Sequence, residues 1–140
     1  MKDKELRIGF RFFALHPMLE SVTIPDDPYC SYDFECNYYI IEVKARDKYY
    51  NEWLIEKLKA RNNLKISKEI RKQFLYLSEY QGICYVHNVS KMVDEGYDFK
   101  WEKRNLPATT EFNKTKWIEK EVGYMHINKS KQINIGETSD

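Results

Sequence analysis

The chain has 140 residues, of which 42% are hydrophobic and 32% charged, and this length suits one domain with one core. Aromatic residues reach 15%, which excludes a disordered chain and predicts a soluble globular protein. No apolar run approaches the ~18 residues that span a bilayer, and the first residues lack a secretory signal. A cytoplasmic protein without membrane association is therefore expected. The net charge of +1 argues against a uniformly basic nucleic-acid binder.

The cysteines are Cys30, Cys36 and Cys84, with no Cys-x-x-Cys pair among them. An odd number of cysteines without a secretory signal argues against a disulfide framework. The spacing also gives little support to a zinc site. We therefore expect reduced side chains.

The first segment, residues 4–15, has two interpretations. From Leu6 to Phe12 the apolar residues alternate with polar or small ones, which is the period of a β-strand. The phenylalanines of this segment also suit a strand. A helix that ends shortly before Pro17 is the alternative, but the alternation by itself favours the strand.

A hairpin is predicted in the next part of the chain. Residues 21–24 form a short β-branched piece, and a Pro- and Asp-rich turn follows at residues 25–28. Tyr32–Cys36 and Tyr38–Ala45 are expected to pair around Asn37. The second of these strands is mostly apolar, so we place it in the middle of a sheet.

A helix is expected over residues 49–64, with Asp47 as its capping residue. Tyr50, Leu54 and Leu58 recur there at helical spacing. Charged residues occupy the other positions, as they would on the solvated sides of an amphipathic helix.

The second half of the chain is predicted to contain three more strands. Phe74–Tyr80 and Ile83–His87 form a pair, residues 89–110 are rich in loops, and Ile118–Ile127 alternates as a last strand. The fold class is therefore mixed α/β, with a single domain over residues 1–127. A polar, flexible tail is expected over residues 128–140.

The chemistry is concentrated in Asp33 and Glu42-Val43-Lys44. If the hairpin forms, Asp33 lies on the strand beside Glu42, and Lys44 points to the same face as Glu42 because strand side chains alternate. Two converging carboxylates remain ionised when a cation lies between them. Oxygen ligands with open water positions suit Mg²⁺ or Mn²⁺.

A structural interpretation of these residues is also open. An acidic residue two positions before a lysine recurs by chance, for example at Asp98-Phe99-Lys100. Glu42 and Lys44 could form an ion pair at the margin of a sheet. Their place on an apolar strand favours function, because charges are costly to bury there.

The stretch YDFECNYYIIEVKARDKYYNEWLIEKLK, residues 32–59, resembles the core of the PD-(D/E)xK nuclease superfamily. It is most similar to small, mostly phage-encoded members and to archaeal-type Holliday-junction resolvases. Tyr32 stands where the name motif of the superfamily has proline. The resemblance implies a restriction-endonuclease-like α-β-β-β-α-β core, so it makes residues 4–15 a helix despite their alternation.

By this resemblance, Asp33 and Glu42 are metal ligands and Lys44 is the catalytic lysine of a Mg²⁺- or Mn²⁺-dependent endonuclease. Many members add a glutamate from the first helix, where Glu5 is the candidate, with Glu35 as its rival. Backbone phosphates of DNA, or alternatively RNA, would then be contacted by Arg46, Lys48, Lys57 and Lys59.

A non-catalytic nucleic-acid- or protein-binding module on the same fold, such as a phage-encoded inhibitor of a host factor, is the alternative function. A homodimer would suit a two-fold symmetric substrate such as a junction.

The distribution of charge along the chain qualifies the conclusion drawn from the net charge. Residues 12–43 contain six acidic residues and no Lys or Arg, whereas residues 44–72 contain ten basic and four acidic residues. A carboxylate site followed by a basic surface is what a metal-dependent nuclease needs. Near-neutrality therefore does not exclude a nucleic-acid partner.

Overall fold

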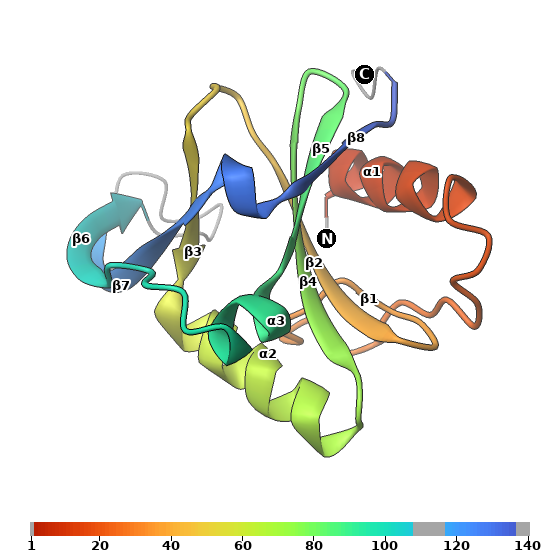
Figure 1. The fold of residues 1–140 in the computed structure, drawn as a ribbon, viewed down its shortest axis with the longest axis horizontal. Helices are drawn as coiled ribbons and strands as arrows, with labels where there is room; N and C mark the ends of the chain where they lie inside the picture. Colours follow the sequence, from red (N-terminus) through yellow and green to blue (C-terminus); the bar gives the residue numbers. More distant parts are fainter. Residues whose placement is uncertain (1, 108–116, 137–140) are drawn as a thin grey trace.

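The computed structural model describes residues 2–107 and 117–136, and it contains two sheets with helices around them (Figure 1). The larger sheet has five strands in the order β1-β2-β4-β5-β8. These are β1 (Phe34–Glu35), β2 (Tyr39–Ala45), β4 (Gln73–Tyr80), β5 (Ile83–Asn88) and β8 (Lys131–Asn134).

The smaller sheet has the order β3-β7-β6 and is antiparallel throughout. Its strands are β3 (Glu52–Glu56), β6 (Glu102–Pro107) and β7 (Trp117–His126). The helices are α1 (Asp3–Ala14), α2 (Lys57–Glu69) and α3 (Val89–Asp94), and a short 3₁₀ turn, η2, covers Ile127–Lys129.

The five-stranded sheet is mixed, which confirms the predicted fold class. β2 runs parallel to β4, while the other neighbours are antiparallel. The connection from β2 to β4 passes through β3 and α2, because parallel strands need a long crossover. In chain order the first six elements are α-β-β-β-α-β, but the third strand belongs to the smaller sheet.

The helices lie on opposite faces of the five-stranded sheet, α1 on one and α2 with α3 on the other (Figure 1). Alternate residues of β2 therefore enter different cores. Ile41 and Val43 pack with Ile8 and Phe12 of α1. Ile40 packs on the other face, with Ala60 of α2 and Met92 of α3 in its cluster.

Residues 3–14 form a helix, so the strand favoured by alternation was wrong and the helix implied by the resemblance was right. Ile8 and Phe12, one helical turn apart, are buried, whereas Phe10 is half exposed. Gly9 is unfavourable in a helix, but a Cβ there would overlap the ring of Phe34. The glycine thus allows the helix to approach β1 closely.

The helix predicted over residues 49–64 was wrong in its first half. Residues 52–56 form β3, with Trp53 and Ile55 buried and the residues between them more exposed. The helix begins at Lys57, with Glu56 and not Asp47 at its N-cap. Tyr50 and Leu58, which suggested a helical stripe, are 57% and 83% exposed, so that stripe covers no core.

Two further predictions need correction. Residues 131–134 of the expected flexible tail form β8, which pairs with β5, and Ile135 is buried. The segment 89–110, predicted as loop-rich, contains α3 and β6. Residues 108–110 and 137–140 of these predictions lie outside the described residues.

The other predicted strands are confirmed as β1, β2, β4, β5 and β7, with β1 shorter than expected and residues 21–24 reduced to a single bridge between Thr23 and Glu35. Among residues 2–107 and 117–136, none of the helices has the length and apolar character needed to cross a bilayer.

Candidate metal and nucleic-acid site

The β1–β2 hairpin brings Asp33 beside Glu42. Phe34 pairs with Ile41 in the antiparallel register, and Asp33 is the residue just before β1, where the regular pairing with β2 ends. The backbone N–H of Asp33 donates to Ile41 O at 2.8 Å, and Val43 N–H donates to Asp33 Oδ2 at 2.7 Å. Backbone hydrogen bonds therefore fix the Asp33 carboxylate at the margin of β2.

Glu42 is a buried carboxylate with little hydrogen bonding. It is 5% exposed, and among the described residues it accepts one long bond, from Asn63 Nδ2 at 3.5 Å. The Asn63 amide is itself held more closely by Ser31. Burial raises the pKa of Glu42 to about 7, with Asp33 and Glu56 adding to the rise and Lys44 and Lys59 opposing it.

The pKa of the Asp33 carboxyl is also raised. Burial raises its pKa, the hydrogen bond from Val43 lowers it, and the charge of Glu5 raises it further. Glu5 on α1 is thus near enough to repel Asp33. Burial thus makes ionisation of both carboxyl groups less favourable, and a bound cation would reverse this effect.

Lys44 lies two residues beyond Glu42 on the same face of β2 and is half-buried. Within the described ranges its ammonium makes no hydrogen bond and no ion pair. Its charge nevertheless lowers the pKa of Asp33, Glu42 and Glu56. A lysine among carboxylates with no direct partner is available to a ligand.

Sequence reasoning missed Glu56, which ends β3 and occupies the N-cap position of α2 without a capping hydrogen bond from its side chain. Its carboxylate forms ion pairs with Lys59 at 3.6 Å and with Lys120 of β7 at 2.5 Å. Burial raises the pKa of Glu56, but the Lys120 hydrogen bond and the charges of Lys59, Lys120 and Lys44 outweigh it and lower the pKa below its usual range. The alternation of residues 52–56 could have indicated a strand, but the position of Glu56 depends on the pairing of that strand with β7.

Glu35, the rival third ligand, is engaged elsewhere. Its Oε2 is 2.6 Å from Lys72 Nζ, and its Oε1 accepts a hydrogen bond from the Tyr32 hydroxyl at 3.2 Å. Glu5, which affects Asp33, is therefore better placed than Glu35 to join the pair.

The four predicted phosphate-contacting residues occupy different positions. Lys59 is near enough to lower the pKa of Glu42, and Lys48 is exposed beyond the end of β2. Lys57 instead pairs with Glu121 at 3.2 Å. Arg46 is half-buried and donates from Nη2 to Leu54 O at 2.8 Å and to the Tyr76 hydroxyl at 3.2 Å.

The donor set was compared with what a divalent ion requires. Among the described residues, no three His, Cys, Asp or Glu side chains are gathered closely enough to enclose an ion. Mg²⁺ is commonly held by one or two carboxylates and keeps several waters. The pair of Asp33 and Glu42, under-bonded and with raised pKa values, fits that mode of binding.

We compared the chain with protein-family models, with curated proteins and with solved structures, and none of the three returned a match. Fold and site thus define a mixed α/β domain with a two-carboxylate, one-lysine centre.

Proposed function

We propose that the protein is a metal-dependent nuclease that hydrolyses phosphodiester bonds, with DNA as its expected substrate. The observation that supports this most strongly is the buried carboxylate of Glu42 beside Asp33, with Lys44 on the same strand face and without a direct partner among the described residues. Burying a carboxylate of raised pKa reduces stability. Such a cost is characteristic of functional sites.

In this proposal Asp33 and Glu42 hold Mg²⁺ or Mn²⁺, and the negative charge of Glu5, which acts on Asp33, adds to the attraction for the ion. The ion, when bound, would polarise the scissile phosphate and lower the pKa of a coordinated water. Lys44 orients the attacking water or neutralises the charge that develops on the phosphate. Lys48 and Lys59 contact neighbouring phosphates.

The test is cleavage of labelled single-stranded, duplex and branched DNA, and of RNA, with Mg²⁺, Mn²⁺ or EDTA. We expect metal-dependent cleavage that Lys44→Ala reduces by at least about a hundredfold. Lys103→Ala is the matched control, because Lys103 is an exposed lysine of the smaller sheet. Cleavage that is absent for every substrate, or equal in wild type and Lys44→Ala, would refute the nuclease.

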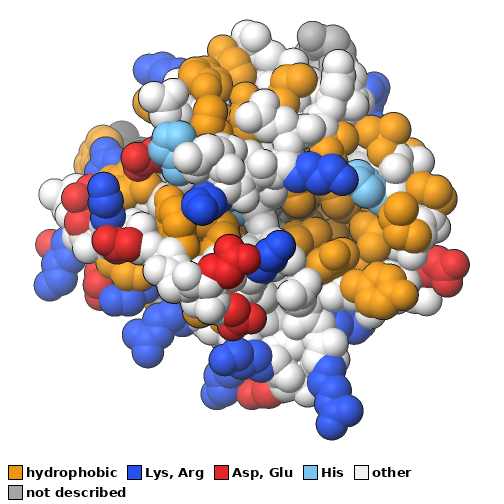
Figure 2. All heavy atoms as spheres, viewed as in Figure 1, with side chains coloured by type: hydrophobic (Ala, Val, Ile, Leu, Met, Phe, Trp, Pro, Cys, Tyr) orange, Lys and Arg blue, Asp and Glu red, His pale blue; other side chains and the backbone are white. Residues whose placement is uncertain are grey.

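A protein-binding module is the second candidate, and one feature favours it. Hydrophobic side chains gather on the α1 side of the molecule (Figure 2). On and after α1, Phe10 and Leu15 are each 51% exposed and Met18 is 60% exposed. Exposed apolar patches mark interaction surfaces. Under this alternative, Phe10→Ser abolishes binding to the partner, whereas Asp33→Asn and Lys44→Ala leave it unchanged.

If the protein acts as a homodimer on a two-fold symmetric substrate, we propose this apolar surface as the dimer interface. Sedimentation of wild type and Phe10→Ser measures this directly. The three cysteines are free, which suits the cytoplasmic location we propose for the protein.

A further inference from the structure

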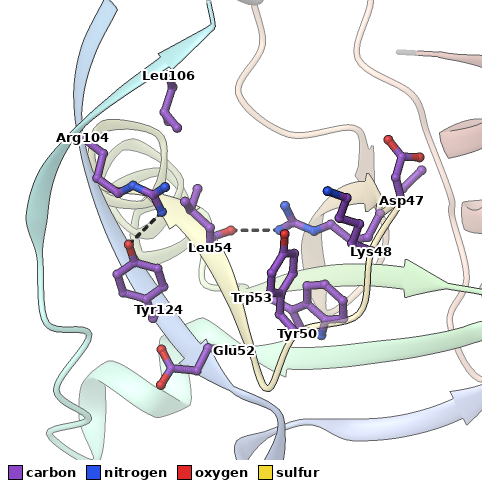
Figure 3. Close-up of a pocket in the computed structure, with 11 residues that line it drawn as sticks. Asp47, Lys48, Tyr50, Glu52, Trp53, Leu54, Arg104, Leu106 and Tyr124 are labelled. Carbon is purple, nitrogen blue, oxygen red and sulfur yellow. Dashed lines mark hydrogen bonds between the residues drawn. The ribbon is translucent and has the colours of Figure 1, made fainter.

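A cavity of about 570 Å³ opens beside the end of β2, between β2 and the smaller sheet (Figure 3). This volume falls within the range of small-ligand sites. The cavity is lined by residues that follow Lys44, by β3, and by facing residues of β6 and β7. Those that the argument uses are Arg46, Lys48, Tyr50, Trp53, Arg104 and Tyr124.

Cationic groups stand around the cavity. Figure 3 shows Lys48 on one side of the cluster and Arg104 on the other, with Tyr50 and Trp53 between them. The carboxylates of Asp47 and Glu52 lie at the periphery of the same view. The centre of the cavity is therefore suited to an anionic group, whereas its margin is not uniformly positive.

Arg46 forms part of the wall and is held firmly. Its guanidinium lies 5.5 Å from the centre of the Trp53 ring and 5.8 Å from that of Tyr76, distances typical of cation–π contacts. Nη2 is bound to Leu54 O, while Nε is buried and has no acceptor among the described residues. The indole N–H of Trp53 is likewise buried without an acceptor.

Aromatic surface is available beside these charges. Tyr50 is 57% exposed, and its ring meets Trp53 edge-on, with centroids 6.2 Å apart. The buried Trp53 therefore supports Tyr50 while leaving a face of Tyr50 free to be covered. Across the cavity the Tyr124 hydroxyl accepts a bond from Arg104 Nη1 at 3.1 Å and donates to Glu102 at 2.6 Å, which directs the Arg104 side chain.

The cavity continues the candidate metal site. Glu42 and Lys44 lie on one face of β2, and Arg46, one residue past the end of the strand, follows at the same spacing, with each step of two residues covering roughly 6.6 Å. Arg46 is thus the next side chain beyond Lys44 on that face. A nucleic-acid strand whose scissile phosphate lies at Lys44 would enter the cavity with its neighbouring nucleotide.

We propose that this cavity binds one unpaired nucleotide next to the scissile bond, with its base stacked on Tyr50 and its phosphate held by Arg104 and Lys48. The proposal rests on the nuclease function and specifies its substrate as single-stranded nucleic acid or a single-stranded segment. In a duplex the faces of the bases are covered by their neighbours, so an aromatic side chain can stack only on a base that is unstacked.

The experiment measures binding without catalysis. Fluorescence anisotropy in EDTA compares a short labelled oligodeoxyuridylate, the oligouridylate of the same length and a blunt-ended DNA duplex without a loop. We expect the wild type to prefer the single strands. Tyr50→Ala and Arg104→Ala should each weaken single-strand binding by about fivefold or more, because stacking and phosphate contacts are lost. The tighter of the two single strands identifies the sugar that is recognised.

The control is Tyr29→Ala, which removes the same ring from a residue 93% exposed and outside the cavity. Thermal unfolding verifies that all variants are folded. Preference for the duplex, or equal affinities of Tyr50→Ala and Tyr29→Ala, would overturn the proposal. Mn²⁺-dependent cleavage assayed on the same samples separates the two hypotheses. Cleavage without Tyr50-dependent binding refutes the cavity alone, and Tyr50-dependent binding without cleavage refutes the nuclease and leaves the cavity as a binding site.

Discussion

The two sheets of this protein carry their charges in opposite ways. In the five-stranded sheet, Glu42 is almost fully buried and accepts one long hydrogen bond within residues 2–107 and 117–136, and burial raises its pKa to about 7. In the smaller sheet, Lys103 and Glu119 form an ion pair at 3.9 Å with side chains 71% and 63% exposed, and such pairs contribute little to stability. Burial and the lack of partners therefore distinguish a candidate site from a solvated surface.

The largest expected effect concerns metal affinity. Glu42→Gln should weaken Mn²⁺ binding by at least about a hundredfold, since loss of even an indirect contact to a metal costs about 10–100-fold. Glu119→Gln, the equivalent change in the smaller sheet, should leave the affinity unchanged. Titration calorimetry measures both. Equal affinities of the two variants would abolish the distinction between the sheets.

The second effect concerns stability without metal. Because the carboxyl of Glu42 has a pKa of 4.5 in its ordinary state and about 7 in the fold, the folded protein holds a proton that the unfolded chain releases. The free energy of unfolding contributed by Glu42 therefore falls as the pH rises from about 4.5 to about 7. Glu42→Gln removes this loss and should stabilise the protein at about pH 8 by at most about 3 kcal/mol.

Urea unfolding of wild type and Glu42→Gln at about pH 5 and pH 8 measures this difference. Comparison of the two proteins is required because His87 acts in the opposite direction: burial lowers its pKa to about 4, so it reduces stability as the pH falls below about 6.5. If Glu42→Gln were no more stable than wild type at either pH, burial of the Glu42 carboxylate would not reduce the stability of the protein.

The third effect compares tightly packed glycines in the two regions. Gly9→Ala should destabilise the protein by about 1–2 kcal/mol, although alanine favours helix by about 1 kcal/mol. The reason is that the new Cβ meets Phe34, which is fully buried and cannot move aside. Gly123→Ala meets the half-buried Trp101 at 2.7 Å and the Cβ of the buried Phe99 at 2.9 Å. These overlaps are less severe than the contact of 2.3 Å at Gly9, so its cost should be smaller. Thermal unfolding ranks the two, and a stabilised Gly9→Ala would contradict the packing.

The smallest effect is expected for the exposed pair. Lys103→Ala or Glu119→Ala should change the free energy of unfolding by less than about 0.5 kcal/mol. Lys120→Ala should cost more, because it leaves the partly buried Glu56 with Lys59 as its remaining ion-pair partner. A double-mutant cycle on each pair tests this order, and an equal coupling energy in the two cycles would contradict it.

Strands rich in apolar residues were predictable from sequence, and helices that depend on contacts were not. β2 and β4 consist mostly of aromatic and aliphatic residues, so their composition and length sufficed. In α1, the alternation of Leu6 to Phe12 conceals the helix, because Phe10 is left on the surface and Gly9 is required by a ring on another strand. Neither fact is visible within the segment itself.

The candidate site likewise contains residues that could be predicted from sequence and one that could not. Asp33, Glu42 and Lys44 are close in sequence, and the pairing of one hairpin brings them together. Glu56 was missed because its position depends on pairing of β3 with the distant β7. The prediction of a flexible tail was wrong for a similar reason. Residues 131–134 are mostly polar, and they form a strand because β5 offers them an unpaired edge.

The parallel pairing of β2 with β4 has a consequence for how the protein folds. Asp33 and Glu42 can meet as soon as one local hairpin forms, whereas Glu56 and Tyr76 reach them only after the chain between Tyr39 and Gln73 has closed into a loop. Closing such a loop costs entropy before any strand contact repays it. The hairpin is therefore free to form in an early, fast phase, and the barrier to folding lies in docking β4 against it. Destabilising substitutions on β4 should consequently slow refolding more than those on α1.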